Sequence, residues 1–143
     1  MRPDQVLLVD DEVEFLDVLR ERLQRRGIEV ETATSGEEAV RRATARSFDA
    51  VVLDLAMPGM DGLETLRQLL AVRPGLQIMI LSGRATVATA VAATKLGAVD
   101  IFEKPTDVET LVQRIRAARA TRLAAEERAT QAEIDEILKT RGW

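Results

Sequence analysis

The stretch AVVLDLAMPGMDG, from Ala50 to Gly62, contains the pattern that decides the fold. It begins with four apolar residues, Ala50–Leu53, which are followed by a single carboxylate at Asp54. A short, β-branched run without polar alternation is typical of a strand buried on both faces of a parallel sheet. Open α/β sheets place their reactive groups at the carboxyl ends of such strands. Asp54 is therefore the first candidate for a functional residue.

The composition is that of one ordinary folded domain. Of the 143 residues, 46% are hydrophobic and 31% are charged, which is sufficient for a single core. The chain has no cysteine, which excludes disulfides and thiolate metal sites. Its net charge of −4 argues against nucleic acid as a direct partner. No apolar run is long enough for a membrane span, and no signal peptide is recognisable, so we expect a cytoplasmic protein with no membrane contact.

The chain also contains no histidine. This removes the commonest general base and metal ligand, and with it Ser-His-Asp catalysis. If a phosphoryl group passes through a histidine, that histidine must belong to another protein. This chain would then receive the phosphoryl group rather than supply it.

Short apolar runs alternate with amphipathic stretches along the chain. Strands are predicted at residues 6–9, 28–33, 50–53, 76–81 and 98–102. Helices are predicted at residues 13–26, 35–45, from 61 to the Pro74-Gly75 break, 86–95 and 107–138. Five βα units with right-handed crossovers predict an α/β fold, a flavodoxin-like three-layer sandwich around a five-stranded parallel sheet.

Three predicted helix starts carry the capping-box spacing, in which a small polar residue precedes a glutamate by three positions. The three pairs are Ser35 with Glu38, Asp61 with Glu64, and Thr106 with Glu109. We therefore expect Ser35, Asp61 and Thr106 to cap these helices.

The last helix is longer than a domain of this size requires. Residues 107–138 contain no glycine or proline, and helix formers dominate them. We divide the chain into a domain, residues 1–120, and an extension of the last helix, residues 121–143. The extension is either a solvated helix end or an α-helical surface for dimerisation or docking. Its acidic residues roughly balance its arginines, so we do not expect it to bind DNA.

Five side chains are predicted to meet at the carboxyl end of the sheet, because they follow the first, third, fourth and fifth strands. They are Asp10, Asp11, Asp54, Ser82 and Lys104. A carboxylate cluster is costly unless a cation neutralises it, and an all-oxygen site prefers Mg²⁺ or Mn²⁺. Phosphoryl transfer needs an oxygen nucleophile, a divalent ion, and cationic and neutral donors. We therefore predict that Asp54 is a nucleophile that accepts a phosphoryl group.

Each of these residues has a structural explanation when it is considered alone. Asp10 or Asp11 could cap the first helix, and Asp54 could cap a turn. Ser82 could belong to an ordinary turn, and Lys104 could be a surface lysine. Their joint position at strand ends, in this order, favours the functional interpretation.

The sequence resembles a response-regulator receiver domain of two-component signalling over about residues 5–119. The resemblance rests on VLLVDDE, VVLDLAMPGMDG, LSGRA and GAVDIFEKP in this order. The chain is CheY-like, and TVATAVAATKLGAVDIFEKP is most similar to receivers of the NtrC and FixJ types. This implies the strand order 2-1-3-4-5 and a phosphoacceptor switch rather than an enzyme. The implied partner is a sensor histidine kinase or a histidine phosphotransfer protein.

The resemblance also assigns roles around the metal. It implies that Asp54 is phosphorylated as an acyl phosphate in the presence of Mg²⁺ (or Mn²⁺). Asp11, Asp54 and the backbone carbonyl of Ala56 would bind the ion directly. Asp10 would act on the ion through water.

The remaining implied roles concern the switch. Lys104 and Ser82 would contact the phosphoryl group, and Lys104-Pro105 would be a cis peptide. Phe102 would be the aromatic switch residue, although an aromatic side chain in the fifth strand could equally be core. Arg84, like Ala56, would flank the phosphoryl group. The fourth helix, fifth strand and fifth helix would then change as one surface, which would control a partner or a homodimer.

A phosphatase of the haloacid-dehalogenase type is the alternative. Such enzymes also use an aspartate nucleophile and Mg²⁺ at a strand end. They need a second acid two residues after the nucleophile, and this chain has Ala56 there.

Overall fold

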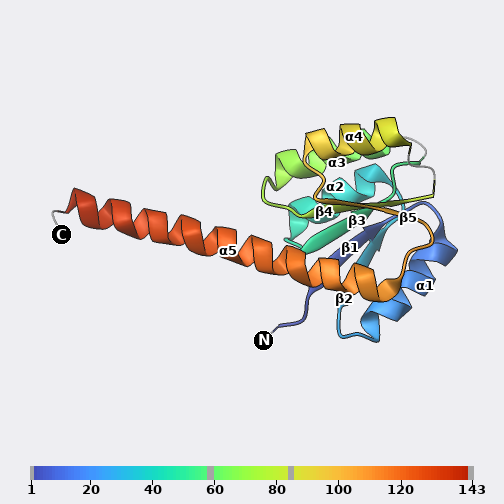
Figure 1. Cartoon of the computed structure of the whole chain (residues 1–143), viewed down its shortest axis with the longest axis horizontal. Coiled ribbons are helices and arrows are strands. Elements are labelled where there is room, and N and C mark those ends of the chain that lie inside the picture. The colour runs from blue at the N-terminus through green and yellow to red at the C-terminus, as the bar shows by residue number, and fades with distance from the viewer. Residues whose placement is uncertain (1, 58–59, 84–85, 142–143) are drawn as a thin grey trace.

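A five-stranded parallel sheet with helices on both faces forms the body of the protein (Figure 1). The computed structural model describes residues 2–57, 60–83 and 86–141. The strands are β1 (Gln5–Val9), β2 (Glu29–Ala33), β3 (Ala50–Leu53), β4 (Ile78–Ser82) and β5 (Asp100–Glu103). The helices are α1 (Val13–Gln24), α2 (Gly36–Ala45), α3 (Gly62–Val72), α4 (Val87–Leu96) and α5 (Val108–Thr140).

The strand order is β2-β1-β3-β4-β5, and every neighbouring pair is parallel. This confirms the predicted flavodoxin-like topology. The chain adds β2 on one side of β1 and all later strands on the other side. The carboxyl ends of β1 and β3 are therefore the switch point of the sheet, where open α/β sheets place their ligands.

The sheet is buried on both faces, as the apolar run in β3 predicted. All four residues of Ala50–Leu53 are buried. Val51 and Leu53 pack in one core cluster with α2, α3 and α4, whereas Ala50 and Val52 pack in a second cluster with α1 and α5. This alternation follows from the two-residue period of a strand.

Helix caps fix where several helices begin. The predicted caps Ser35 and Asp61 are confirmed, since each side chain accepts a hydrogen bond from the backbone N–H three residues later, at 3.2 and 2.8 Å. The prediction for α5 is wrong by one residue, because Asp107 rather than Thr106 is the N-cap and accepts from the backbone N–H of Glu109 at 3.3 Å. A carboxylate at this position also suits the positive end of the helix dipole.

Helix α5 is continuous from Val108 to Thr140 and projects far beyond the sheet (Figure 1). Only its first part faces the core, through Leu111, Val112, Ile115 and Ala118. Within the described ranges, no helix combines the length and apolarity that a bilayer crossing requires.

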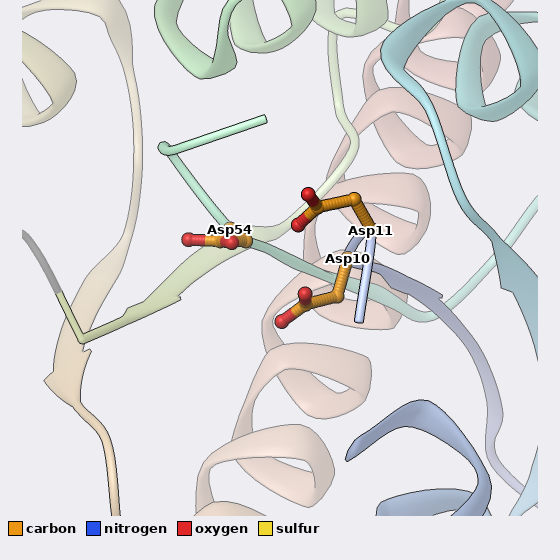
Figure 2. A group of neighbouring side chains, drawn as sticks. All are labelled: Asp10, Asp11 and Asp54. Carbon is orange, nitrogen blue, oxygen red and sulfur yellow. The ribbon is translucent and has the colours of Figure 1, made fainter. Parts of the chain in front are cut away.

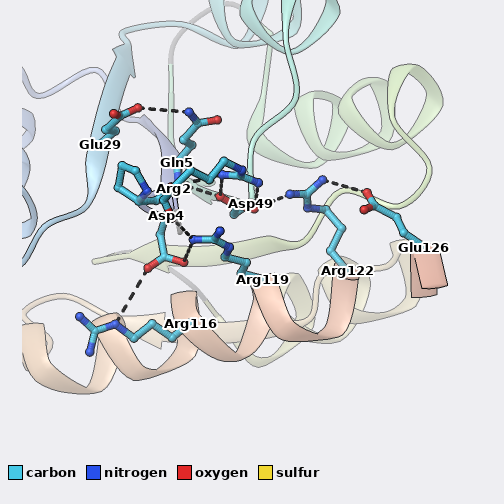
Figure 3. Close-up of polar contacts among 10 residues, drawn as sticks. Arg2, Asp4, Gln5, Glu29, Asp49, Arg116, Arg119, Arg122 and Glu126 are labelled. Carbon is cyan, nitrogen blue, oxygen red and sulfur yellow. Dashed lines mark hydrogen bonds and ion pairs between the residues drawn. The ribbon is translucent and has the colours of Figure 1, made fainter. Parts of the chain in front are cut away.

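A buried carboxylate ties α5 to the N-terminal segment where the helix leaves the sheet (Figure 3). Asp49, just before β3, is fully buried. Its carboxylate accepts hydrogen bonds from Arg2 at 2.8 and 3.0 Å, from the backbone N–H of Gln5 at 2.8 Å, and from Arg122 at 2.5 Å. Burial alone would raise the pKa of Asp49, but these donors together lower it to about 2.

A second acid extends this network along α5. Asp4 accepts a hydrogen bond from Arg119 at 3.3 Å and lies 4.0 Å from Arg116. Arg119 also donates to the backbone carbonyl of Arg2 at 2.7 Å. Residues 2–5 are therefore held between the sheet and α5, and α5 is held against the sheet as far as Arg122.

Removing the Asp49 charge should weaken the fold in a pH-dependent way. We expect Asp49→Asn to lower the free energy of unfolding by about 3 kcal/mol near neutral pH, because Arg122 would lose its buried counter-charge. The folded pKa of about 2 lies below the ordinary value of 3.8. The contribution of Asp49 is therefore complete above about pH 4 and is lost as the pH falls toward 2.

Denaturant unfolding of both proteins between pH 2 and pH 7 measures this difference. Glu126→Gln is the matched control, because Glu126 binds the same Arg122 at 2.9 Å from an exposed position. Exposed pairs contribute little, so the control should change stability by less than about 1 kcal/mol. A constant loss for Asp49→Asn across this pH range would contradict the prediction.

Candidate functional site

Three carboxylates gather at the switch point of the sheet (Figure 2). Asp10 and Asp11 follow β1, and Asp54 follows β3, whose last residue pairs with the last residue of β1. One oxygen from each carboxylate lies within 4.8 Å of the others. Asp10 and Asp54 are buried, whereas Asp11 is exposed. The sequence correctly predicted that these three acids meet.

The backbone fixes these carboxylates by continuing the sheet one residue beyond β1 and β3. The N–H of Asp10 donates to the carbonyl of Ala33 at 3.1 Å, and the N–H of Asp54 donates to the carbonyl of Val9 at 2.9 Å. One oxygen of Asp10 accepts from the N–H of Glu12 at 2.9 Å. Asp10 is not the cap of α1, because the N-cap is Glu12, which has no side-chain cap hydrogen bond. Asp10 instead holds the N–H of that N-cap residue, while its second oxygen binds Lys104.

The loop after Asp54 is held by a close approach that only glycine permits. A Cβ atom on Gly62 would lie 2.2 Å from the Cα of Leu55, next to Asp54. The N–H of Gly62 donates to the carbonyl of Leu55 at 3.2 Å. The Asp61-Gly62 pair predicted a helix start, but the need for glycine comes from this contact with Leu55, seven residues earlier.

Lys104 brings a positive charge to the carboxylates from the end of β5. Its ammonium donates to Asp10 Oδ2 at 2.5 Å and lies 4.0 Å from Asp54 Oδ2. Glu12 is 3.8 Å away on the exposed side. The peptide between Lys104 and Pro105 is cis.

The sequence interpretation missed one residue of this site, Phe15. The Lys104 ammonium lies 4.1 Å from the centroid of the Phe15 ring. Phe15 stands one helical turn after Asp11, and its place on the apolar stripe of α1 gave no reason to consider it more than core. The sequence signal that could have indicated Phe15 is its position four residues after Asp11, an acid of the site.

The balance of charge makes the cluster suitable for a cation. Burial raises the pKa of Asp10; the hydrogen bonds from Lys104 and from the Glu12 N–H oppose this, and the charge of Asp54 raises it further. The carboxylates of Asp11 and Asp54 border a pocket of about 160 Å³, whose other lining residues are Glu12, Ala56, Gly83 and Lys104. Oxygen donors around an under-compensated negative charge are what a hard divalent cation binds.

Ser82 lies beside Lys104. It is buried at the end of β4, and its carbonyl accepts a hydrogen bond from the Lys104 N–H at 3.2 Å. The predicted group at the sheet edge is thus Asp10, Asp11, Asp54, Ser82 and Lys104, and the structure places all five there. Arg84, which the resemblance placed beside the phosphoryl group, lies outside the described residues.

The Phe102 side chain lies on one face of the sheet, and α4 lies on the opposite face. It packs against the core cluster of α1 and α5, whereas its neighbour Ile101 packs against the cluster that contains α3 and α4. The two-residue period of β5 causes this separation. The switch role of Phe102 remains a prediction, and its ring lies on the α1 and α5 side of the sheet.

The sequence profile of the response regulator receiver domain family matches residues 6–116. The chain belongs to this family. ZraR of Escherichia coli O157:H7, a transcriptional regulatory protein, is 36% identical over 115 residues, which cover 80% of this chain and 26% of ZraR. The receiver therefore spans about a quarter of the length of that relative.

Solved structures of response regulators share the fold. NtrX from Brucella abortus superposes with a TM-score of 0.82 at 31% identity, over 90% of this chain and 29% of NtrX. A response regulator from Burkholderia pseudomallei superposes with a TM-score of 0.75 at 29% identity, over 97% of this chain and 86% of that protein. The structure of that protein contains a phosphorylated aspartic acid and a calcium ion.

Membership of this family makes the chain the receiver of a two-component response regulator, which is a signalling switch. The alternative of a haloacid-dehalogenase phosphatase finds no support. Ala56, two residues after Asp54, provides no acid for that chemistry.

Asp11 allows the metal site to be tested separately from the fold. Because Asp11→Asn removes one of three clustered negative charges from an exposed position, we expect it not to destabilise the metal-free protein and to raise its stability slightly. At about ten times its dissociation constant, Mg²⁺ should stabilise the wild-type protein by about 1.4 kcal/mol. This gain should be absent from Asp11→Asn. Thermal unfolding with EDTA and with Mg²⁺ measures it.

Asp17→Asn is the control, because Asp17 is an exposed acid in the neighbouring helix α1 that pairs only with Arg20 among the described residues. It should retain the full gain from Mg²⁺. An equal Mg²⁺-dependent shift in Asp11→Asn would contradict the assignment of the metal site.

Proposed function

We propose that Asp54 accepts a phosphoryl group from a histidine of a sensor kinase or of a phosphotransfer protein. The observation that carries this proposal is the position of Asp54, a buried carboxylate at the switch point with two further carboxylates and one ammonium around it. Because the chain has no histidine, the donor residue belongs to the partner. The proposed location of the reaction is the cytoplasm, where a kinase has access to its nucleotide.

The proposed metal is Mg²⁺ (or Mn²⁺). Asp11, Asp54 and the carbonyl of Ala56 would bind it directly, and Asp10 would act through water. When bound, the ion neutralises the carboxylates and the oxygens of the incoming phosphoryl group. The acidic donor set and the raised pKa of Asp10, which burial causes, support this assignment.

Asp54, Lys104 and Ser82 have separate roles in the proposed reaction. An oxygen of Asp54 forms a bond to phosphorus while the bond from phosphorus to the histidine nitrogen breaks. Lys104, 4.0 Å from Asp54, provides a positive charge for the phosphoryl oxygens. Ser82 provides a hydroxyl donor from the end of β4. The product is an acyl phosphate whose charge shifts the receiver between two states.

The protein acts in this proposal as a switch and not as a turnover enzyme. Ala56 has no group that could activate water beside Asp54. The response would pass through Ser82, Lys104 and Phe102 to the surface formed by α4, β5 and α5.

Asp54→Asn tests the phosphoacceptor directly. Incubation with acetyl phosphate and Mg²⁺ should add one phosphoryl group to the wild-type protein and none to the variant, as read by intact-protein mass. Asp61→Asn should be labelled like the wild type, because Asp61 is an exposed helix cap and asparagine caps equally well. Stable labelling of Asp54→Asn with one phosphoryl group would show that the assignment is wrong.

We propose a homodimer as the output, through the α4–β5–α5 face or through the extension of α5. Both surfaces expose apolar side chains. Those on the first surface are Val87, Val91 and Val99, and those on the extension are Leu123, Ile134, Ile137 and Leu138. The proposed division into a receiver, residues 1–120, and an extension, residues 121–143, makes the extension the output segment.

ZraR is a transcriptional regulatory protein, and this chain covers 26% of its length. A protein that contains this receiver could have that role. The charges on the described part of the extension are mixed, so we propose that this chain does not itself contact nucleic acid.

Light scattering after size exclusion, with and without beryllofluoride, tests the dimer. We expect the mass of two protomers with beryllofluoride and Mg²⁺. The double variant Ile134→Ser/Ile137→Ser should restore one protomer if the extension pairs, and Val87→Ser/Val91→Ser should do so if the α4 face pairs. One protomer under both conditions would rule out the dimer.

A further inference from the structure

We propose that Phe15 is a positioning residue for phosphoryl transfer, because its ring holds the Lys104 ammonium beside Asp54. The proposal rests on the proposed role of Asp54 as phosphoacceptor. Its basis is the placement of the ammonium 4.1 Å from the centroid of the Phe15 ring. A cation at this distance from the ring is attracted by the negative face of the aromatic system.

The ammonium is held from two sides. Asp10 accepts its hydrogen bond at 2.5 Å, and the ring of Phe15 lies against it as a second, uncharged partner. The Lys104 side chain is only 15% exposed, so water screens this contact less than it would at an open surface. A lysine has a flexible four-carbon stem, and two contacts fix the position of its charge better than one.

An aromatic partner has a specific advantage over another acid. A third buried carboxylate at residue 15 would also hold the ammonium, but its charge would repel the incoming phosphoryl group. The ring attracts the cation without adding a negative charge. The positive charge of Lys104 therefore stays available to Asp54, 4.0 Å away.

The fold supports the ring in this position. Phe15 is partly buried and packs against the core cluster of α1 and α5. The start of α1 is itself oriented by the hydrogen bond from the Glu12 N–H to Asp10. The metal-ligand candidate Asp11 thus lies just before α1, and the ring that holds Lys104 lies in the first turn of that helix.

Ring fluorination separates the electrostatic role of Phe15 from its packing. We would place 3,4,5-trifluorophenylalanine at residue 15, since fluorine weakens the negative ring face with little change of shape. We expect the maximal rate of phosphorylation by acetyl phosphate to fall about threefold, with the Mg²⁺ affinity unchanged. The same substitution at Phe48, a buried ring in the other core cluster, should leave the rate unchanged.

Nuclear magnetic resonance tests the contact without any phosphorylation. The chain has three lysines, Lys95, Lys104 and Lys139. With labelled lysine, the ε-methylene protons of Lys104 should be shifted upfield by the ring, and the other two lysines serve as internal references. Phe15→Leu should move the Lys104 signal to the position of the references.

These measurements distinguish the proposal from the function on which it rests. If the wild-type Lys104 signal coincides with the references, or if fluorination at residue 15 leaves the rate unchanged, the positioning role is overturned. Loss of labelling in Asp54→Asn would then still support the phosphoacceptor. If Asp54→Asn is labelled like the wild type, both the function and the role of Phe15 fail.

Discussion

Two buried carboxylates share one ammonium at the carboxyl end of this sheet, and the site depends on that imbalance of charge. Lys104 binds Asp10 at 2.5 Å and stands 4.0 Å from Asp54. Burial raises the pKa of Asp10 despite this ion pair. The fold therefore maintains a negative charge at this site that its own residues do not fully neutralise. A divalent cation is the simplest group that would neutralise it.

Asp49 shows that the same fold can stabilise the negative charge of a buried acid with its own hydrogen-bond donors. It is fully buried, yet donors from Arg2, Gln5 and Arg122 lower its pKa to about 2 although burial opposes them. Asp49 precedes β3 and Asp54 follows it. The carboxylate at the start of this strand accepts four hydrogen bonds, whereas the one at its end accepts one from the N–H of Ala56 at 3.2 Å and lies 4.0 Å from Lys104. Burial alone does not mark a functional acid; the deficit of partners does.

The sequence was sufficient for the topology and for the five groups at the sheet edge, because apolar periodicity locates strands and parallel strands bring their carboxyl ends together. It was insufficient where a role depends on contacts between distant segments. The side of β5 on which Phe102 lies depends on which face of the edge strand meets the cluster of α1 and α5, and the ring of Phe15 under Lys104 depends on α1 and the end of β5 meeting in space. The helix cap at Asp107 was missed for a local reason, since two adjacent residues could each serve.

The two ends of β3 also constrain where a response to phosphorylation can occur. The start of β3 is held by the hydrogen bonds of Asp49, and its side chains are buried on both faces. A strand fixed in this way cannot absorb a new charge by moving, because close-packed interiors resist small displacements. In the proposed switch, the groups that respond are Ser82 and Lys104 at the ends of β4 and β5, which a backbone hydrogen bond joins. In that proposal, a displacement of one of them would reach the other through this hydrogen bond, and would reach α5 through the segment that follows β5.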